Sequence, residues 1–179
     1  MSIIKTFKEL FIFLKSPILE KDTNKKFDYR IIKFFQILTF CLFTSYLFIF
    51  ISSLFENFHL VKYQDYVFNI SFKNVINLLF FILIISTIEE IIFRAPLTLF
   101  KNKQTFKIVF YLSAFVFAYI HFNYNITLYT VLFSPLLVAP QFFAGLYYNF
   151  IRVKFGLIWS ICLHITYNLT IFALNIFLF

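Results

Sequence analysis

The sequence predicts an all-α, polytopic helical membrane protein with about five transmembrane helices and an amino-terminal interfacial amphipathic helix. Three observations predict this fold class. Hydrophobic residues make up 61% of the 179 residues, against about 45–50% in soluble domains. Long apolar runs follow one another with short charged breaks. No run alternates with the period of two that a strand requires, and because lipid cannot satisfy free backbone groups, a closed set of helices remains.

Residues 1–20 predict the interfacial helix. Apolar residues recur at helical spacing on one face, while lysines and a glutamate lie elsewhere. The apolar positions are Ile3, Ile4, Phe7, Leu10, Phe11 and Leu14. A secretory signal is disfavoured because Lys8, Glu9 and Lys15 interrupt any apolar core and no small-residue cleavage site follows.

The apolar stretches that follow predict the spans. Each is near or above the ~20 residues needed to cross the hydrocarbon core, the third being the shortest. They run from about Phe34 to Phe55, Val75 to Phe100, Phe106 to Phe122, Ile126 to Ile151 and Leu157 to Phe179. Pro135 and Pro140 should kink or break the fourth, where Gln141 could help line a cavity. Two glycines and four prolines leave little material for long linkers, so we predict a single membrane domain over residues 1–179.

The net charge of +8 is explained by topology. Lysines and arginines lie between the apolar stretches rather than along a basic face, so we expect the lipid bilayer, and no nucleic acid, as a partner. One side of the predicted bundle carries 13 of these residues and the other carries two, Lys62 and Lys73. The 13 are Lys5, Lys8, Lys15, Lys21, Lys25, Lys26, Arg30, Lys33, Lys101, Lys103, Lys107, Arg152 and Lys154. The positive-inside rule then predicts a bacterial-type cytoplasmic membrane location with the amino terminus cytoplasmic and the carboxyl terminus outside.

Ionisable side chains inside the apolar stretches indicate a functional site. They are Glu89, Glu90, Arg94, His121 and His164. A charge at the bilayer centre costs about 2.5 kcal/mol or more, so such residues need partners or a function. Glu90 and Arg94 lie four apart and should pair on one helix face, an arrangement that also serves simply to dock helices. Glu89 is rotated by about 100° from Glu90 and should project toward other spans, where it can accept or donate a proton.

The two histidines belong with Glu89. A single intramembrane histidine is more typical of a helix-to-helix hydrogen bond. Helix geometry, however, places Glu89, His121 and His164 at similar depth if the second span stays helical through residues 96–100. Asn168, one turn after His164, shares its face and offers an amide donor. Such a group can hold a water, activate it and stabilise an oxyanion.

Three ordered motifs also carry a resemblance to a known family. They are E-E-I-I-F-R from Glu89 to Arg94, F-A-Y-I-H from Phe117 to His121, and H-I-T-Y-N from His164 to Asn168. They resemble the motifs EExxxR, FxxxH and HxxxN of the CAAX prenyl protease and bacteriocin-processing family of intramembrane endopeptidases. The resemblance covers about residues 75–174, which we expect to be the catalytic core.

The resemblance implies hydrolysis of a peptide bond in a membrane-associated or prenylated substrate. It implies activation of water by Glu89 and His121, stabilisation of the oxyanion by His164 and Asn168, and organisation of the site by Glu90 and Arg94. Where family members commonly have Gly after the arginine, this chain has Ala95 and Pro96, which should alter the bend at the end of the second span.

A divalent metal such as zinc is left open as a cofactor. Glu89, His121 and His164 could supply a carboxylate and two imidazoles to zinc with an open water position. The spacing lacks a compact H-E-x-x-H pair, and a glutamate with a histidine can deprotonate water unaided.

Two other functions stay open beside the endopeptidase. One is a non-catalytic membrane protein for bacteriocin immunity or export, with the polar cluster as a scaffold. The other is a small proton-coupled carrier, since intramembrane Glu and His also act as relays. The carrier is disfavoured because the sequence has no internal repeat and no matching pair of broken helices in its two halves.

Overall fold

The computed structural model describes residues 2–63 and 72–178, and these residues are helical apart from turns, connections and an isolated bridge between Tyr63 and Tyr124. In chain order the elements are α1 (Ile3–Lys15), α2 (Phe27–Asn57), α3 (Phe72–Phe93), the 3-10 helix η1 (Pro96–Leu99), α4 (Lys103–Ile120), α5 (Leu128–Leu132), α6 (Ser134–Leu137), α7 (Ala139–Phe155) and α8 (Leu157–Leu178). The all-α prediction is confirmed for the described residues.

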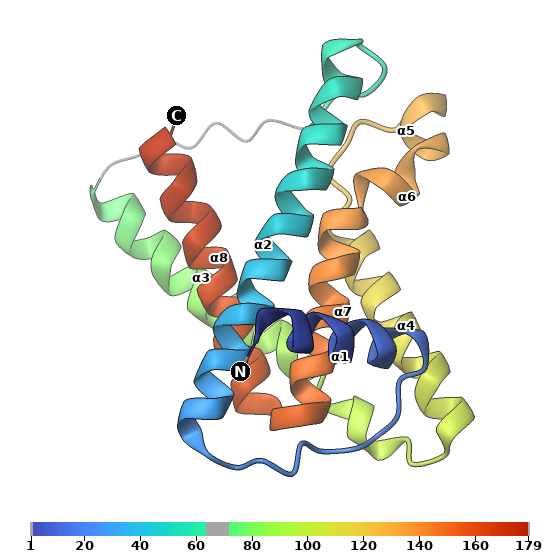
Figure 1. Ribbon diagram of the computed structural model, residues 1–179. Helices are drawn as coiled ribbons and strands as arrows, with labels where there is room; N and C mark the ends of the chain where they lie inside the picture. Colours follow the sequence, from blue (N-terminus) through green and yellow to red (C-terminus); the bar gives the residue numbers. More distant parts are fainter. Residues whose placement is uncertain (1, 64–71, 179) are drawn as a thin grey trace.

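The long helices form one bundle. α2, α3, α4, α7 and α8 run alternately in opposite directions, and α1 lies across α2 and α7 (Figure 1). Three segments of the described chain are long and apolar enough to cross a membrane: Phe27–Asn57, Val75–Leu99 and Leu157–Leu174. α4 and α7 are not among them, so the count of about five spans stays a prediction.

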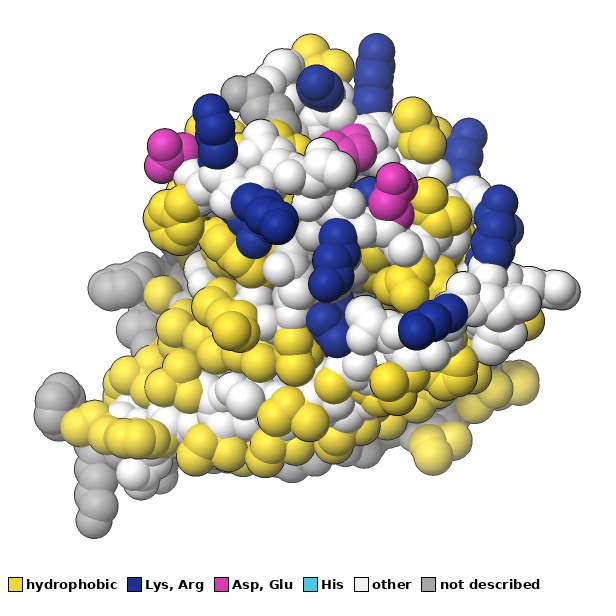
Figure 2. Space-filling model, turned by 90° about the horizontal axis from the view of Figure 1, so that it is seen from below, with side chains coloured by type: hydrophobic (Ala, Val, Ile, Leu, Met, Phe, Trp, Pro, Cys, Tyr) yellow, Lys and Arg dark blue, Asp and Glu magenta, His cyan; other side chains and the backbone are white. Residues whose placement is uncertain are grey.

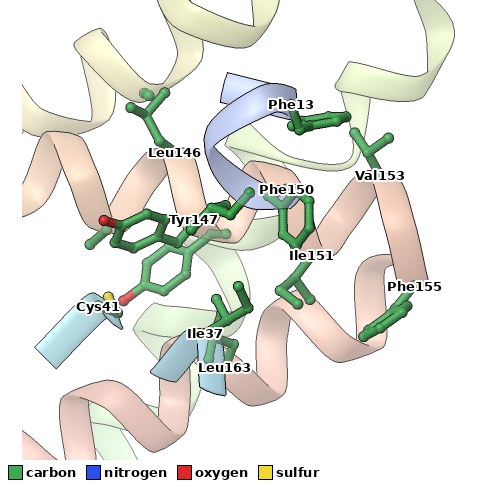
Figure 3. Close-up of a cluster of buried hydrophobic side chains, with 14 of the residues drawn as sticks. Phe13, Ile37, Cys41, Leu146, Tyr147, Phe150, Ile151, Val153, Phe155 and Leu163 are labelled. Atoms are coloured by element: carbon green, nitrogen blue, oxygen red, sulfur yellow. The ribbon is translucent and has the colours of Figure 1, made fainter. Parts of the chain in front are cut away.

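α7 is the central helix of the bundle. Every residue from Ala144 to Ile151 is buried, and the helix contacts α2, α4 and α8. Figure 3 shows Tyr147 and Phe150 of α7 within a cluster that also includes Phe13 of α1. Gly145 permits the close approach to α4, because a Cβ there would lie 3.2 Å from the Cα of Ala114. Protein rather than lipid therefore surrounds Tyr147, Tyr148 and Asn149 of α7.

The predicted fourth span, Ile126–Ile151, is not one helix. It is divided into α5, α6 and α7, with Pro135 and Pro140 in the first turns of α6 and α7. Proline fits a first turn because its missing N–H would have no helical partner there. The predicted break is therefore present, and α7 continues beyond Ile151 to Gly156, whose φ of 109° ends the helix.

The second span also differs from its prediction. α3 ends at Phe93, and the chain turns at Arg94 and Ala95 into η1. Residues 96–99 continue the span as the 3-10 helix η1 and not as an α-helix, because Pro96 lacks the N–H that a continuing α-helix needs. Glu89 consequently lies near the end of α3. That Ala95, in place of the family's Gly, alters the bend at this point stays a prediction.

α1 is a helix as predicted, but its apolar residues divide into two groups. Leu10 and Phe13 are buried against the bundle, whereas Ile4 and Phe7 are 63% and 52% exposed. One side of α1 is thus part of the core and another side is free to meet lipid. Its place at the membrane interface stays a prediction.

A buried lysine attaches α1 to the bundle. Lys33 of α2 is fully buried, and its Nζ lies 2.6 Å from Glu9 Oε1, 2.8 Å from Asp22 Oδ2 and 3.0 Å from the Tyr29 hydroxyl. Burial alone would raise the pKa of Asp22, but hydrogen bonds from Lys33, the Asn24 N–H and Tyr29 hold that pKa below its ordinary value. The three charges therefore fasten α1 and the connection after it to α2.

One end of the bundle is basic. The connection before α2, the connection between α3 and α4, and the junction of α7 and α8 meet there (Figure 1). Figure 2 shows lysine and arginine side chains gathered on this face. The clustering agrees with the sequence-based count, although the side chain of Lys73 lies outside the described residues. The orientation of this face toward the cytoplasm stays a prediction.

We expect Asp22→Asn to lower the free energy of unfolding by about 1.5 kcal/mol at neutral pH, because buried Lys33 loses a charged acceptor. The pKa of Asp22 is lowered on folding, so this difference from wild type is present above the unfolded-state pKa of about 3.9 and disappears as the pH falls through the folded-state value. Denaturant unfolding in detergent, followed by the fluorescence of Trp159, measures it.

Glu20→Gln is the matched control, since Glu20 is exposed on the same connection. Equal stability of wild type, Asp22→Asn and Glu20→Gln at neutral pH would show that Asp22 does not hold Lys33.

Candidate active site

A cavity of about 330 Å³ lies among α2, α3, α4, α7 and α8. Its polar lining includes Ser86, Glu89, His121, Gln141, His164 and Asn168. The four residues predicted to be catalytic thus reach one cavity from three helices, and Gln141 lines it as predicted. One wall is apolar, with Ile49, Phe81, Ile82, Ile85 and Ile171.

Glu89 of α3 lies between the two histidines. Its Oε1 is 3.4 Å from His121 Nε2, at the carboxyl end of α4, and its Oε2 is 3.6 Å from His164 Nε2, on α8. The Glu89 side chain is 17% exposed and that of His164 only 3%. As predicted, Glu89 projects toward other helices.

The orientation of His121 is set by its own helix. His121 Nδ1 lies 2.7 Å from the carbonyl oxygen of Phe117. Because a carbonyl only accepts, Nδ1 carries a proton, and when the ring is neutral Nε2 is an acceptor that faces the Glu89 carboxylate. Two acceptors 3.4 Å apart repel each other unless a donor bridges them, and a water molecule has two O–H groups for that purpose.

Glu90 is directed to the opposite side, into the protein. It is fully buried, and its Oε1 lies 3.4 Å from Arg94 Nε and 3.1 Å from His164 Nδ1. Its Oε2 accepts a hydrogen bond from Ser160 of α8. The predicted pair of Glu90 and Arg94 is therefore formed, and it also holds His164.

Arg94 lies behind the cavity among aromatic rings. Its guanidinium is fully buried, 4.1 Å from the ring centroid of Phe117 and 5.2 Å from that of Tyr148. None of its nitrogens makes a hydrogen bond with the described residues. Its charge is balanced by Glu90 and by the ring faces, an arrangement typical of cation–π contacts.

A side chain of α3 positions the amide of Asn168. Asn168 Nδ2 donates to Ser86 Oγ at 2.9 Å. Ser86 stands three residues before Glu89, so one helix supplies both the carboxylate and the group that orients the amide. The predicted sharing of one cavity by His164 and Asn168 is present.

Sequence reasoning missed the supporting residues. Ser160 stands four residues before His164 on the same helix face, a spacing that could have been noticed. Arg152 of α7 could not, because two of its partners are backbone carbonyls. Nε donates to the Arg94 carbonyl at 2.9 Å, and a terminal nitrogen donates to the Ala95 carbonyl at 3.3 Å and to Thr98 Oγ1 at 3.0 Å. These bonds hold the turn at which α3 ends.

The donor set does not have the arrangement of a metal centre. Within residues 2–63 and 72–178, no three His, Cys, Asp or Glu side chains converge closely enough to hold a metal ion. His121 and His164 each face a different oxygen of Glu89. We therefore derive no step through zinc.

A family model identifies the chain. Residues 71–170 match the model described as "Type II CAAX prenyl endopeptidase Rce1-like". These 100 residues are more than half of the 179 in the chain. The chain belongs to this Rce1-like family. No curated protein and no solved structure matches it.

The Rce1-like match contains all three motifs and agrees with the family resemblance seen in the sequence. Glu89, His121 and Asn168 fall within the matched residues, as do the positions that support them. The family is one of proteases, and three segments can cross a membrane by length and composition. The chain is therefore an integral membrane protein of a hydrolase family.

We expect Ser160→Ala to destabilise the protein by about 1–3 kcal/mol, because Glu90 Oε2 would stay buried without its donor. Thermal unfolding in detergent measures the loss. Ser53→Ala is the control, since the Ser53 hydroxyl bonds the carbonyl of Phe50 within an exposed turn of α2. If both variants unfold like wild type, Ser160 does not support Glu90.

Proposed function

We propose that this protein is an intramembrane endopeptidase that hydrolyses a peptide bond in a membrane-associated or prenylated substrate. The observation that carries the proposal is the placement of Glu89 Oε1 3.4 Å from His121 Nε2, at the wall of a cavity. A single water that donates to both acceptors is held and polarised there. Membership of the Rce1-like family supports the same reaction.

Glu89 and His121 activate this water. As the water oxygen bonds to the carbonyl carbon of the substrate, one proton passes to Glu89 and the other O–H stays directed to His121 Nε2. The carbonyl π electrons move to oxygen and form a tetrahedral oxyanion. When the C–N bond breaks, the proton on Glu89 passes to the leaving amine, so that one water is consumed for each peptide bond.

His164 and Asn168 stabilise the oxyanion. Both ring nitrogens of His164 face carboxylate oxygens, at 3.1 Å for Glu90 and 3.6 Å for Glu89. Nε2 of His164 lies at the cavity wall, where an N–H on this nitrogen donates to the oxyanion. The Asn168 amide supplies a second donor. Donors held in place before reaction stabilise developing charge most effectively where water is scarce.

The apolar wall suits a lipid-linked substrate. Phe81 stands eight residues before Glu89 on α3, which corresponds to about 12 Å along the helix. An acyl or isoprenoid chain can lie against this wall while the attached peptide reaches Glu89. Such a substrate enters the cavity from the bilayer. In this proposal the basic face lies toward the cytoplasm of a bacterial-type membrane, and the carboxyl terminus lies outside.

Glu89→Gln and His121→Ala should each reduce cleavage of lipidated peptides by about 100-fold or more, because each removes an acceptor for the attacking water. The measurement is peptide hydrolysis by purified protein in liposomes, with folding checked by thermal unfolding. Glu20→Gln and His59→Asn are matched controls outside the cavity. Cleavage at the wild-type rate by Glu89→Gln would remove the proposed base, and protection from a toxin without any cleavage would favour the non-catalytic immunity function.

Exhaustive treatment with 1,10-phenanthroline should leave this cleavage unchanged, because the reaction proposed here uses only side chains of the chain. The chelator-treated protein is assayed beside an untreated sample, and its metal content is determined by mass spectrometry. Loss of cleavage that added zinc restores would establish a metal-dependent mechanism in its place.

A further inference from the structure

Gln141 lines the cavity with an unused carboxamide. Among the other polar groups that line the cavity, Ser86 bonds Asn168, Tyr167 bonds Ser45 at 2.9 Å, and Glu89 faces the two histidines. Gln141 is half-buried, and its side chain makes no hydrogen bond with residues 2–63 or 72–178. A carboxamide that lines a cavity without a protein partner is available for a ligand.

The backbone of Gln141 belongs to a hydrogen-bonded helical turn. It stands in the first turn of α7 after buried Pro140, and the Phe142 N–H donates to the Val138 carbonyl at 3.0 Å across the same turn. The remainder of α7 is the central helix of the bundle. Gln141 therefore belongs to an element that does not need to move to meet a substrate.

The chemistry of the amide fits a peptide main chain. A substrate peptide that enters the cavity loses water from the peptide groups on either side of the scissile bond, and an unsatisfied group costs about as much as a lost hydrogen bond. Glu89, His121, His164 and Asn168 serve the scissile carbonyl and the water. A carboxamide has both a donor and an acceptor, and because it is neutral its desolvation is less costly than that of a charged group.

We propose that Gln141 binds a main-chain peptide group next to the scissile bond and so positions the scissile carbonyl over Glu89. The proposal rests on the endopeptidase function proposed above. Gln141 is a substrate-positioning residue in this scheme. Because it binds main-chain atoms, it recognises an extended peptide whatever side chains that peptide carries.

Gln141→Met keeps the side-chain size and removes both hydrogen-bonding groups. We expect kcat/KM for a lipidated peptide to fall about tenfold in liposomes, with unchanged thermal unfolding. Gln104→Met is the control, because Gln104 is exposed in the first turn of α4, outside the cavity. A kcat/KM for Gln141→Met equal to that of wild type and Gln104→Met would overturn the proposal.

Ester substitution in the substrate separates positioning from a structural effect. In a series of peptides, one amide N–H at a time near the scissile bond is replaced by an ester oxygen. Wild type should lose about tenfold at one position, and Gln141→Met should show no further loss there. Equal losses in both proteins at every position would overturn the proposal, even if Gln141→Met were slower overall.

The two proposals fail in different ways. Cleavage by wild type that is lost in Glu89→Gln, together with identical ester profiles for wild type and Gln141→Met, leaves the endopeptidase intact and removes the role of Gln141. Absence of cleavage by wild type for every peptide, or full cleavage by Glu89→Gln, removes the proposed function and the role of Gln141 with it.

Discussion

The candidate site depends on one buried carboxylate, that of Glu90. It contacts Arg94, at the turn that follows α3, and both Ser160 and His164 on α8. A charge without water must be compensated by nearby charge and hydrogen bonds, so α3 and α8 can approach only in the register that brings these groups together. This register also places Glu89, the preceding residue, at the cavity wall between two imidazole rings.

Adjacent glutamates acquire different roles because a helix turns by about 100° per residue. The carboxylate of Glu90 is fully buried and contacts Arg94, Ser160 and His164. The Glu89 side chain is 17% exposed, and its two oxygens lie 3.4 Å from His121 Nε2 and 3.6 Å from His164 Nε2. Those separations exceed the usual hydrogen-bond length of about 2.7–3.2 Å. A carboxylate that is held but not saturated is the one that can take up a proton from water.

Periodicity and charge made much of this arrangement predictable. That His121 reaches the same cavity as Glu89 and His164 depends on how α3, α4 and α8 pack. The spacing of Glu90 and Arg94, the different direction of Glu89, and the shared face of His164 and Asn168 follow from helix geometry. Patterns within single helices carry that information. The supporting contacts could not be predicted in this way. Arg152 bonds backbone carbonyls of a turn that has no sequence pattern of its own, and Lys33 pairs with residues of another helix and of a connection.

The same limit explains why the fourth span was the least accurate prediction. Hydropathy describes how a helix meets lipid, but α7 meets other helices on every side and so can carry Tyr148, Asn149 and Arg152. A central helix of this kind need not be long or strongly apolar. It can begin in the interior after a proline break, and a helix that begins there presents the polar side chain of its first turn, Gln141, to the cavity and not to the membrane surface.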